Sequence, residues 1–284
     1  MPQVPQQLVQ QQAQLALQED IGNGDVTARL LDQHQLADAR VISREQGVIC
    51  GTAWFDEVFR QLDPGIRIDW SVQDSDTVDA NQLLCRLHGP THALLTGERA
   101  ALNFLQTLSG TATVTQRYVQ AMGSSRTRLL DTRKTIPGLR LAQKYAVTCG
   151  GGHNHRSGLY DMVLIKENHV TSCGSITAAV HAAMQQFPDL PIEVEVESLE
   201  ELHQAIDAGA HRILLDNFAV ADLHQAVVLT AGRAELEISG NVTLDNIAEL
   251  AAIGVDYIST GAITKHVTAL DLSMRVTAIE NEPA

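Results

Sequence analysis

The chain has 284 residues, of which 44% are hydrophobic and 19% are charged, so it can bury one large core or form two domains of ordinary size. Its 20 Lys and Arg residues against 34 Asp and Glu residues give a formal net charge of −14. A chain this acidic is repelled by nucleic acid and by anionic membrane surfaces, which argues against a general role in binding either.

The cysteines and the N-terminus indicate the compartment. Cys50, Cys85, Cys149 and Cys173 are far apart and form no C-x-x-C pair, which fits neither a zinc ribbon nor a disulfide-rich secreted scaffold. The N-terminus is rich in glutamine and lacks the basic and apolar regions of a signal peptide. No run approaches the roughly 20 apolar residues that span a bilayer. The sequence predicts a cytoplasmic protein with reduced thiols and no membrane segment.

The first third of the chain predicts a small domain of mixed helices and strands. Residues 12–19 predict a helix, followed by a turn at Asn23-Gly24 and a short element that ends near Leu31. Strand patterns cover residues 39–51, 66–72 and 83–89, and residues 52–62 predict a helix. Residues 96–122 are mostly helical, with an interruption expected at Ser109-Gly110. We place a domain boundary at this point, so that residues 1–110 form the first domain.

The rest of the chain alternates short apolar strands with helices. The predicted strands cover residues 127–131, 160–166, 192–196, 212–216, 236–239 and 256–260, and the helices between the later strands cover 175–187, 198–209, 219–232 and 243–254. Such alternation indicates parallel βα units, in either a doubly wound sheet or a (β/α) barrel. Polar residues recur where all six strands end. A barrel gathers every strand end into one mouth, whereas an open sheet gathers mainly two, so the pattern favours a barrel.

Positive charge is concentrated in one segment. Residues 126–166 hold eight basic and two acidic residues, so this window carries +6 and the remainder of the chain carries −20. A basic island in an acidic chain indicates a pocket for a small, multiply anionic ligand. Four of these cations have no local feature that singles them out, and we interpret them as solvated: Arg126, Arg128, Arg140 and Lys144.

The other cations and two carboxylates fall at the predicted strand ends. Thr132-Arg133-Lys134 follows one strand, while Arg156 and Lys166 bracket the next. Arginine matches a carboxylate with two parallel hydrogen bonds, and lysine is a point charge suited to phosphate. Arg133 and Arg156 are therefore candidates for binding carboxylate, and Lys134 and Lys166 for binding phosphate.

Glu195 and Asp216 end two successive strands. Both carboxylates suit Mg²⁺ or the hydroxyl groups of a sugar. As an ionised pair they would also stabilise a positive centre that develops between them.

Two late loops and one histidine complete the candidate site. Ser239-Gly240-Asn241 and Thr260-Gly261-Ala262 each follow a strand and precede a helix, a position where backbone N–H groups bind phosphate. The motifs of P-loop and Rossmann nucleotide sites are missing from the sequence. We expect His155 to donate a hydrogen bond to an anionic ligand, because the neighbouring Arg156 would repel a metal ion.

Taken together, these segments resemble the quinolinate phosphoribosyltransferases, also called carboxylating nicotinate-nucleotide pyrophosphorylases. The resemblance covers nearly the whole chain. Its motifs are EDIGNGDVT and GERAALNFLQTLSGTAT, then DTRKTIPGLR (131–140), KYAVTCGGGHNHRSGLYDMVLIKENH (144–169), IEVEVES (192–198), ILLDN (213–217), ISGN (238–241) and ISTGAITKH (258–266). Two departures are small: His153 stands where relatives often have a small residue, and Lys265-His266 differs from a common ending.

The resemblance implies an α/β fold with an N-terminal α/β sandwich domain and an incomplete (β/α) barrel as the C-terminal domain. It places the barrel at 111–267 and returns the tail, about 268–284, to the first domain. It implies that quinolinate reacts with phosphoribosyl pyrophosphate and Mg²⁺, giving nicotinate mononucleotide, pyrophosphate and CO₂ in NAD biosynthesis. It also implies a homodimer or a hexamer of dimers.

Site roles follow from the same resemblance. Arg133, His155 and Arg156 would hold the quinolinate carboxylates, together with Arg99 from the partner subunit. Lys134 and Lys166 would contact phosphoribosyl pyrophosphate. Glu195 and Asp216 would lie by the ribose hydroxyls and Mg²⁺, which is held mainly through the substrate. The loops at 239–241 and 260–262 would hold phosphate.

Three alternatives stay open at this point. Lys166 at a barrel strand end would also suit a Schiff-base aldolase or lyase. A related phosphoribosyltransferase with another acceptor would keep the phosphate loops. A non-catalytic anion-binding protein on the same scaffold is less favoured, because Lys134, Lys166, Glu195 and Asp216 are all intact.

Overall fold

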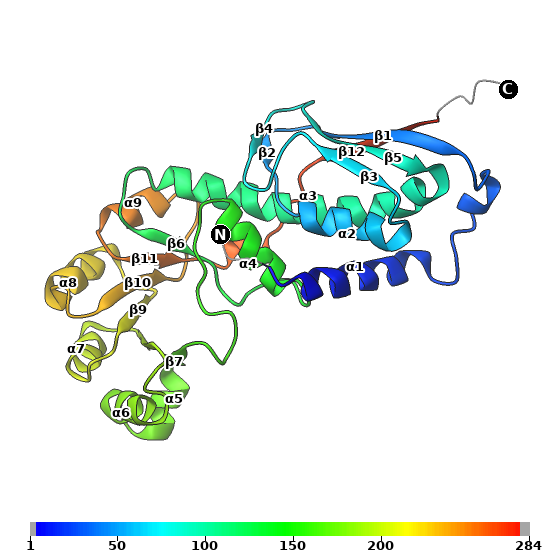
Figure 1. Ribbon diagram of the computed structural model, residues 1–284. Helices are drawn as coiled ribbons and strands as arrows, with labels where there is room; N and C mark the ends of the chain where they lie inside the picture. The colour runs from blue at the N-terminus through cyan, green and yellow to red at the C-terminus, as the bar shows by residue number, and fades with distance from the viewer. Residues whose placement is uncertain (1–3, 279–284) are drawn as a thin grey trace. The chain divides into compact units, whose positions relative to one another are not determined.

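The computed structural model describes residues 4–278, which form two compact units (Figure 1). Unit 1 takes the described residues up to Gln116, residues 137–151, and those from Val267 onward. Unit 2 takes residues 117–136 and 152–266. No helix among the described residues is both long enough and apolar enough to cross a membrane.

Unit 1 is a sheet covered by helices. Its elements are α1 (Gln6–Ile21), the short 3₁₀ helix η1 (Ala28–Leu30), β1 (Leu36–Ser43), β2 (Gly47–Val48), α2 (Thr52–Leu62), β3 (Arg67–Trp70), β4 (Thr77–Val78), β5 (Leu83–Pro90), most of α3 (Thr91–Ala121), α4 (Arg140–Cys149) and β12 (Leu272–Ala278). The antiparallel sheet has the order β12-β1-β5-β3, and β2 pairs with β4. The C-terminal strand β12 therefore joins the first domain by pairing with β1; residues 279–284 of the expected tail lie outside the described residues.

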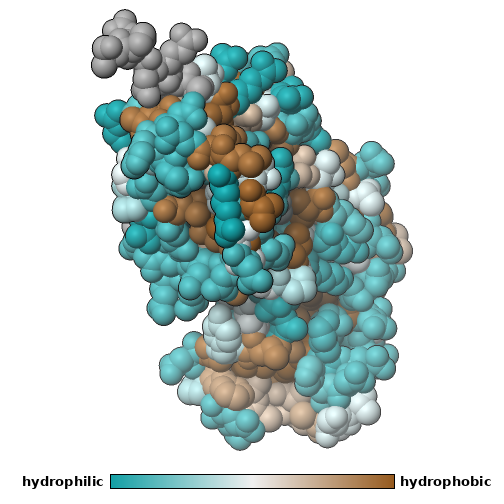
Figure 2. Space-filling view, turned by 90° about the vertical axis from the view of Figure 1, so that its right-hand side faces the viewer, coloured by the Kyte–Doolittle hydropathy of each residue, from teal (hydrophilic) through white to brown (hydrophobic). Residues whose placement is uncertain are grey.

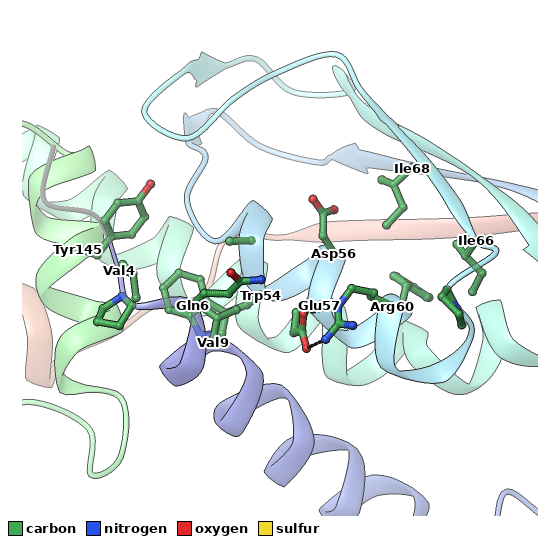
Figure 3. A pocket seen from close by; sticks show the side chains of 14 residues that line it. Val4, Gln6, Val9, Trp54, Asp56, Glu57, Arg60, Ile66, Ile68 and Tyr145 are labelled. Atoms are coloured by element: carbon green, nitrogen blue, oxygen red, sulfur yellow. Dashed lines mark hydrogen bonds and ion pairs between the residues drawn. The ribbon is translucent and has the colours of Figure 1, made fainter.

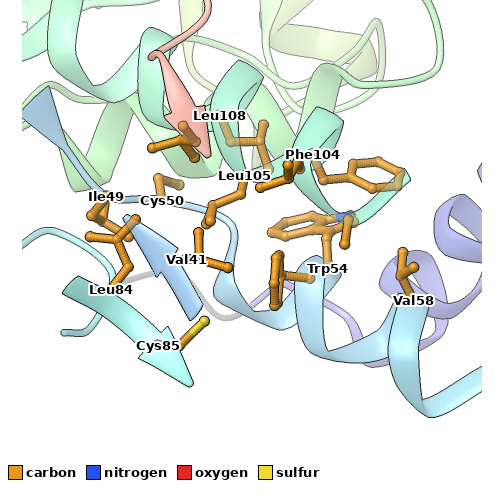
Figure 4. Packing of buried hydrophobic residues seen from close by; sticks show 14 of the residues in the cluster. Val41, Ile49, Cys50, Trp54, Val58, Leu84, Cys85, Phe104, Leu105 and Leu108 are labelled. Carbon is orange, nitrogen blue, oxygen red and sulfur yellow. The ribbon is translucent and has the colours of Figure 1, made fainter. Parts of the chain in front are cut away.

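The core of unit 1 lies between the sheet and its helices. Trp54 and Phe55 of α2 are fully buried, and Leu105 and Leu108 of α3 pack into the same cluster (Figure 4). The Trp54 indole N–H donates to Gln12 Oε1 at 2.7 Å, so the polar atom of this buried ring is satisfied.

Unit 2 is built on a parallel sheet of six strands. Its elements are β6 (Arg128–Leu130), β7 (Val163–Ile165), α5 (Glu167–Cys173), α6 (Ile176–Gln186), β8 (Ile192–Val196), α7 (Leu199–Asp207), β9 (Arg212–Asp216), α8 (Val220–Thr230), β10 (Glu235–Ser239), α9 (Ile247–Ala252), β11 (Tyr257–Ser259) and α10 (Ala262–Lys265). Serine residues cap two of the helices, because Ser175 and Ser198 accept backbone N–H groups at the starts of α6 and α7.

The strand order separates the two predicted topologies. It reads β6-β11-β10-β9-β8-β7, so each strand from β7 to β11 lies beside its successor and the first strand, β6, follows the last. A doubly wound sheet reverses direction at a switch point, whereas this order is that of a barrel left open between β6 and β7. The prediction of an α/β chain with an incomplete barrel is confirmed.

Helix α3 differs from its prediction. It runs without a break through Ser109 and Gly110, although this pair usually interrupts helices. Ser109 Oγ accepts the backbone N–H of Cys50 at 2.9 Å. The missing side chain of Gly110 leaves room for the backbone carbonyl of Thr268. Both residues are small because neighbouring backbone approaches the helix closely, so they do not mark a break.

The unit boundaries also differ from the expected ranges. The division within α3 falls after Gln116, whereas the sequence analysis placed it after residue 110. Residues 137–151, which we had assigned to the barrel, belong to unit 1. The reason is helix α4, which the strand pattern did not predict: Gln12 Nε2 donates to Gly138 O at 2.6 Å, and Tyr145 donates to Asp74 Oδ2 at 2.9 Å.

Candidate active site

One edge of the unit 2 sheet collects most of the predicted site residues, because parallel strands end on the same side. We call this edge the mouth. The residues at or just after the ends of the six strands, in chain order, are Thr132, Lys166, Glu195, Asp216, Ser239 and Thr260.

Two carboxylates and a lysine meet at the mouth. Lys166 Nζ forms an ion pair with Glu195 Oε2, and their side chains are 44% and 18% exposed, so the pair lies at the border between barrel and solvent. Burial, and then the neighbouring Glu195 carboxylate, raises the pKa of Asp216, while Lys166 and Lys134 oppose this rise. The strand ends therefore bring Lys134, Lys166, Glu195 and Asp216 into electrostatic contact.

The same carboxylates suit a divalent cation. Because Glu195 contributes to the raised pKa of Asp216, the two negative charges repel each other, and a cation between them would relieve this repulsion. Mg²⁺ prefers oxygen donors and usually takes one or two carboxylates together with substrate phosphates. The donor set fits Mg²⁺ held in this way.

The loops after β6 and β11 pack on each other. Thr264 Oγ1 donates to the backbone carbonyl of Lys134 at 2.7 Å, and the side chains of Lys134 and Thr132 lie against Gly261. Thr132 Oγ1 accepts the Lys134 N–H at 3.0 Å, and Thr260 Oγ1 accepts the Ala262 N–H at 3.2 Å. These contacts bring together the two segments that the sequence predicted separately for phosphate.

The loop after β10 is tied to the end of β9. Gly240 has a φ of +90°, and the Asn217 side chain occupies the space that a Cβ atom would need there. Asn217 Oδ1 accepts the Asn241 side-chain N–H at 3.2 Å, and Asn217 Nδ2 donates to Asp216 Oδ2 at 2.9 Å. The sequence analysis missed Asn217, although it directly follows Asp216 in the motif ILLDN.

Arg133 and Arg156 form a second positive region. The Nε atom of Arg133 is buried and has no hydrogen-bond partner within the described residues. Burial, and then the Arg133 guanidinium, lowers the pKa of Arg156, while Glu193 and Asp161 oppose this shift. Two guanidinium groups close enough to repel each other, one with an unused donor, suit an anionic ligand.

The contacts of His155 lie in the interior of unit 2. Its ring is buried, and Nε2 lies 2.8 Å from Glu193 Oε2 and 3.5 Å from Glu237 Oε2. Its Nδ1 accepts the backbone N–H of Arg156 at 2.7 Å. Its Nε2 faces these two buried carboxylates. The expected hydrogen bond from His155 to an anionic ligand stays a prediction. Neither Glu193 nor Glu237 was singled out from the sequence.

Arg99 lies apart from the mouth residues along the chain. It is an exposed residue of α3 in unit 1, whereas the residues described above belong to unit 2. The expected contribution of Arg99 across a subunit interface stays a prediction.

Unit 1 has its own hollow of about 900 Å³, which contains none of the predicted site residues (Figure 3). Apolar residues such as Trp54, Ile66 and Ile68 line much of it. Two of its polar side chains pair with each other, since Arg60 Nε donates to Glu57 Oε2 at 2.7 Å. This hollow therefore does not resemble the predicted anion site.

Unit 1 also holds a cluster of two thiols and a carboxylate. The ligand atoms of Cys50, Asp74 and Cys149 lie within 4.8 Å of one another. Asp74 is already engaged, because Oδ1 accepts two backbone N–H groups at the start of α2 and Oδ2 accepts the Tyr145 hydroxyl. Its contacts explain Asp74 as a cap of α2 without any metal ion.

Comparison with known proteins gives one consistent family. Models described as the N-terminal and C-terminal domains of quinolinate phosphoribosyl transferase match residues 25–109 and 111–275. A Bacillus subtilis protein named probable nicotinate-nucleotide pyrophosphorylase [carboxylating] is 42% identical, over 93% of this chain and 91% of that protein. A Synechocystis protein of the same name is 43% identical, over 92% of this chain and 90% of its own.

A solved structure agrees with both matches. The nicotinate-nucleotide pyrophosphorylase from Francisella tularensis superimposes with a TM-score of 0.93 at 48% identity, and the match covers 97% of this chain and 98% of that one. The fold, the sequence motifs and the sequence identity all indicate the same family. The chain belongs to the quinolinate phosphoribosyltransferase family.

Proposed function

We propose that this chain transfers the phosphoribosyl group of phosphoribosyl pyrophosphate to the ring nitrogen of quinolinate. The products are nicotinate mononucleotide, pyrophosphate and CO₂, in the biosynthesis of NAD. Family membership supports this reaction. The structural observation that carries it is the presence, in one unit, of a two-arginine anion site and of a mouth where two lysines and two carboxylates interact.

Arg133 and Arg156 bind the dicarboxylate. Quinolinate carries two neighbouring carboxylates, and each guanidinium can donate two parallel hydrogen bonds to one of them. The unused Nε donor of Arg133 would find its acceptor there, and the repulsion between the two arginines would turn into attraction for the ligand. The arginines thereby orient the pyridine nitrogen toward the ribose.

The transfer step needs charge stabilisation and no general base, because the pyridine nitrogen already has a lone pair. The nitrogen forms a bond to C1 of the ribose while the bond to pyrophosphate breaks, and positive charge develops on the ribose. Glu195 and Asp216 are placed to stabilise that charge, and Lys134 and Lys166 to hold the departing pyrophosphate. The 2-carboxylate then leaves as CO₂, its bonding electron pair stays on the ring carbon beside the positively charged nitrogen, and a proton from water adds to that carbon.

Mg²⁺, when bound through the substrate and Glu195 or Asp216, would neutralise charge on pyrophosphate. The loops Ser239-Gly240-Asn241 and Thr260-Gly261-Ala262 would hold the remaining phosphate with backbone N–H groups. Their fixed geometry supports this role, since Asn217 and Thr264 hold one loop each.

The ion pair of Lys166 argues against Schiff-base chemistry. A lysine that forms an imine must first offer a neutral amine. Glu195 stabilises the charged ammonium group instead. Lys166 therefore serves as a cation for phosphate and not as a nucleophile.

We also propose that the chain works in the cytoplasm as a homodimer, or as a hexamer of dimers, with Arg99 completing the partner's site. Figure 2 shows one face on which apolar side chains interrupt a polar surface. Exposed large apolar side chains of unit 1 include Val26, Leu30 and Leu95, and Leu95 lies one helical turn before Arg99. Exposed apolar surface of this kind supports a subunit interface.

Mixing two variants tests the shared site. At quinolinate concentrations near the wild-type KM, Arg99→Ala and Arg133→Ala should each have little activity alone, because every site in either homodimer lacks one arginine. A mixed dimer contains one site with both arginines, so activity should return after the two are unfolded and refolded together. Sedimentation should show a dimer or larger assembly. A monomer, or no recovery in mixed dimers, would contradict the proposal.

The reaction itself is tested by one assay. Purified protein is incubated with quinolinate, phosphoribosyl pyrophosphate and Mg²⁺, and nicotinate mononucleotide and CO₂ are followed, with nicotinate as a parallel acceptor. Product from quinolinate alone is expected, and EDTA should abolish it until Mg²⁺ is restored. No product from quinolinate with folded protein would refute the proposed function. Product from nicotinate would point to a paralogue with another acceptor.

A further inference from the structure

The interior of unit 2 holds two carboxylates that the proposed mechanism does not use. Glu193 of β8 and Glu237 of β10 are both fully buried, and we call them the buried carboxylate pair. The Arg212 guanidinium lies 3.6 Å from Glu237 Oε2, and His155 Nε2 lies 2.8 Å from Glu193 Oε2. Burying two carboxylates side by side destabilises the folded protein. Residues that destabilise the fold are candidates for a functional role.

The proton on His155 can be assigned from its two contacts. Nδ1 accepts the Arg156 backbone N–H, so Nδ1 carries no proton. In the neutral ring the proton must then lie on Nε2, which faces the buried carboxylate pair. The ring therefore places the Nε2 proton beside the buried carboxylate pair and accepts the backbone N–H of Arg156 through Nδ1.

The same assignment argues against a metal ion among these residues. The ligand atoms of His155, Glu193 and Glu237 lie within 4.8 Å of one another, close enough for a metal site. A metal on Nε2 would require a neutral ring to carry its proton on Nδ1, which the Arg156 N–H contact prevents. Arg212 already supplies a positive charge beside Glu237. Glu193 and Glu237 therefore serve to hold the His155 ring in place and not to bind a metal ion.

Both predicted carboxylate-binding arginines are connected to His155. The backbone N–H of His155 donates to Asp131 Oδ1 at 2.9 Å, and Asp131 lies two residues before Arg133. His155 itself precedes Arg156 and accepts its N–H. The negative charge of Glu193 also opposes the effect of Arg133 on Arg156, so it offsets the repulsion between the two guanidinium groups.

We propose that Glu193 and Glu237 are positioning residues for dicarboxylate binding: they fix the orientation of His155, which fixes the backbone at Arg156 and keeps the two arginines together. This inference rests on the proposed function, because it assigns the pair to the quinolinate half of that site. It implies that losing either carboxylate harms the binding of quinolinate and not that of phosphoribosyl pyrophosphate.

The test compares three variants of the full-length protein. Glu193→Gln and Glu237→Gln keep the side-chain shape and remove the charge. Glu235→Gln is the matched control, because Glu235 lies on the same strand as Glu237 and contacts Arg212 and Tyr257, and its side chain is 49% exposed. The measurements are KM for each substrate, the Kd of quinolinate by calorimetry, and the thermal unfolding temperature.

We expect the two buried variants to raise the KM and Kd for quinolinate by about tenfold or more, as small displacements in a preorganised site do. The KM for phosphoribosyl pyrophosphate should stay within about twofold of the wild-type value, because the lysines and mouth carboxylates do not depend on His155. The unfolding temperature should stay equal or rise, since an amide replaces a buried carboxyl group whose ionisation opposes folding. The control should match the wild type in all three measurements.

Other outcomes would overturn the inference. Unchanged quinolinate binding in folded Gln variants would do so, as would an equal rise in both KM values together with a lower unfolding temperature. If a Gln variant does not fold, His155→Asn gives a second test, because its amide oxygen can still accept the Arg156 N–H while the ring nitrogen beside Glu193 is lost. It should reproduce the loss of quinolinate affinity, and normal affinity would contradict the inference.

The design separates the inference from the proposed function. Wild-type protein that binds quinolinate but forms no product would refute the proposed reaction. The Kd of quinolinate measured for the variants would still test the positioning role of Glu193 and Glu237. Wild-type protein that neither binds nor converts quinolinate would refute both.

Discussion

Replacing Arg133 with alanine should weaken quinolinate binding about a hundredfold without destabilising the free enzyme. In the free protein, Arg133 Nε has no hydrogen-bond partner among the residues described, and the guanidinium repels Arg156. Its removal therefore costs the free protein little. In the complex, a guanidinium makes two charge-assisted hydrogen bonds to a carboxylate, each contributing about 1.5–3 kcal/mol. Taking the lower value twice gives about 3 kcal/mol, or roughly two factors of ten in Kd.

Calorimetry with quinolinate measures this loss directly, and thermal unfolding of the free protein tests whether the fold is intact. Arg126→Ala is a matched control, because Arg126 is an exposed arginine of the same unit. Arg133→Lys should fall between alanine and the wild type, since it keeps the charge but loses the planar donor pair. A Kd within about threefold of the wild-type value for Arg133→Ala would refute the assigned role and the estimate above.

Three further changes test other parts of the structure. Lys166→Met should lower kcat by on the order of a hundredfold or more, while stability changes by less than about 1 kcal/mol because the ion pair with Glu195 is partly exposed; a normal rate would contradict the role in transfer. Burial, and then the neighbouring Glu193 carboxylate, raises the pKa of Glu237 from its ordinary value of 4.5 to about 8, so the folded state holds this proton more tightly than the unfolded state. The free energy of unfolding should therefore fall as pH rises from about 4.5 through about 8, and urea unfolding should show a weaker dependence in Glu237→Gln; equal pH profiles would argue against the shift. Gly110→Ala should destabilise the protein by about 1–3 kcal/mol despite the higher helix propensity of alanine, because its Cβ would collide with the Thr268 carbonyl; an unchanged unfolding temperature would show that the chain yields there.

The barrel and its mouth were predictable because their signals are local. A strand of the barrel is a short apolar run, and a polar residue at its end marks the mouth, so Lys166, Glu195 and Asp216 stand out without knowledge of the contacts. Parallel strands then place these ends together whatever the helices do. The prediction needed only the order of patterns along the chain.

Helix α3 shows where local signals fail. Ser109 and Gly110 form a typical breaker pair, but their small size serves contacts with Cys50 and Thr268, which are distant in sequence. Helix α4 was missed for a similar reason, since it packs in unit 1 although it lies between two barrel strands in the chain. In α3, tertiary contacts overrode local propensity, whereas α4 shows that position in the sequence does not decide which unit a helix joins.

The depth of a side chain inside the barrel also escaped prediction. Alternation places Glu193, Glu195 and Glu197 on the same face of β8, yet the structure buries the first, half-buries the second and exposes the third. The alternation of side chains along a strand predicts which face of the sheet a residue lies on, but not how deep in the barrel it lies. Glu195 was recognised as a mouth residue, while the burial of Glu193 required the structure.

The two buried glutamates explain how Arg133 and Arg156 can stay near each other without a ligand. Carboxylates at the mouth itself would bind the arginines directly and compete with the carboxylates of the substrate. Behind His155, the same negative charge still opposes the repulsion between Arg133 and Arg156, but it cannot take the place of the ligand. The desolvation that this position demands appears as the raised pKa of Glu237. The two buried carboxyl groups thus lower the free energy of unfolding while they preorganise the anion site. Such a loss of stability is expected where function depends on the geometry of a binding site.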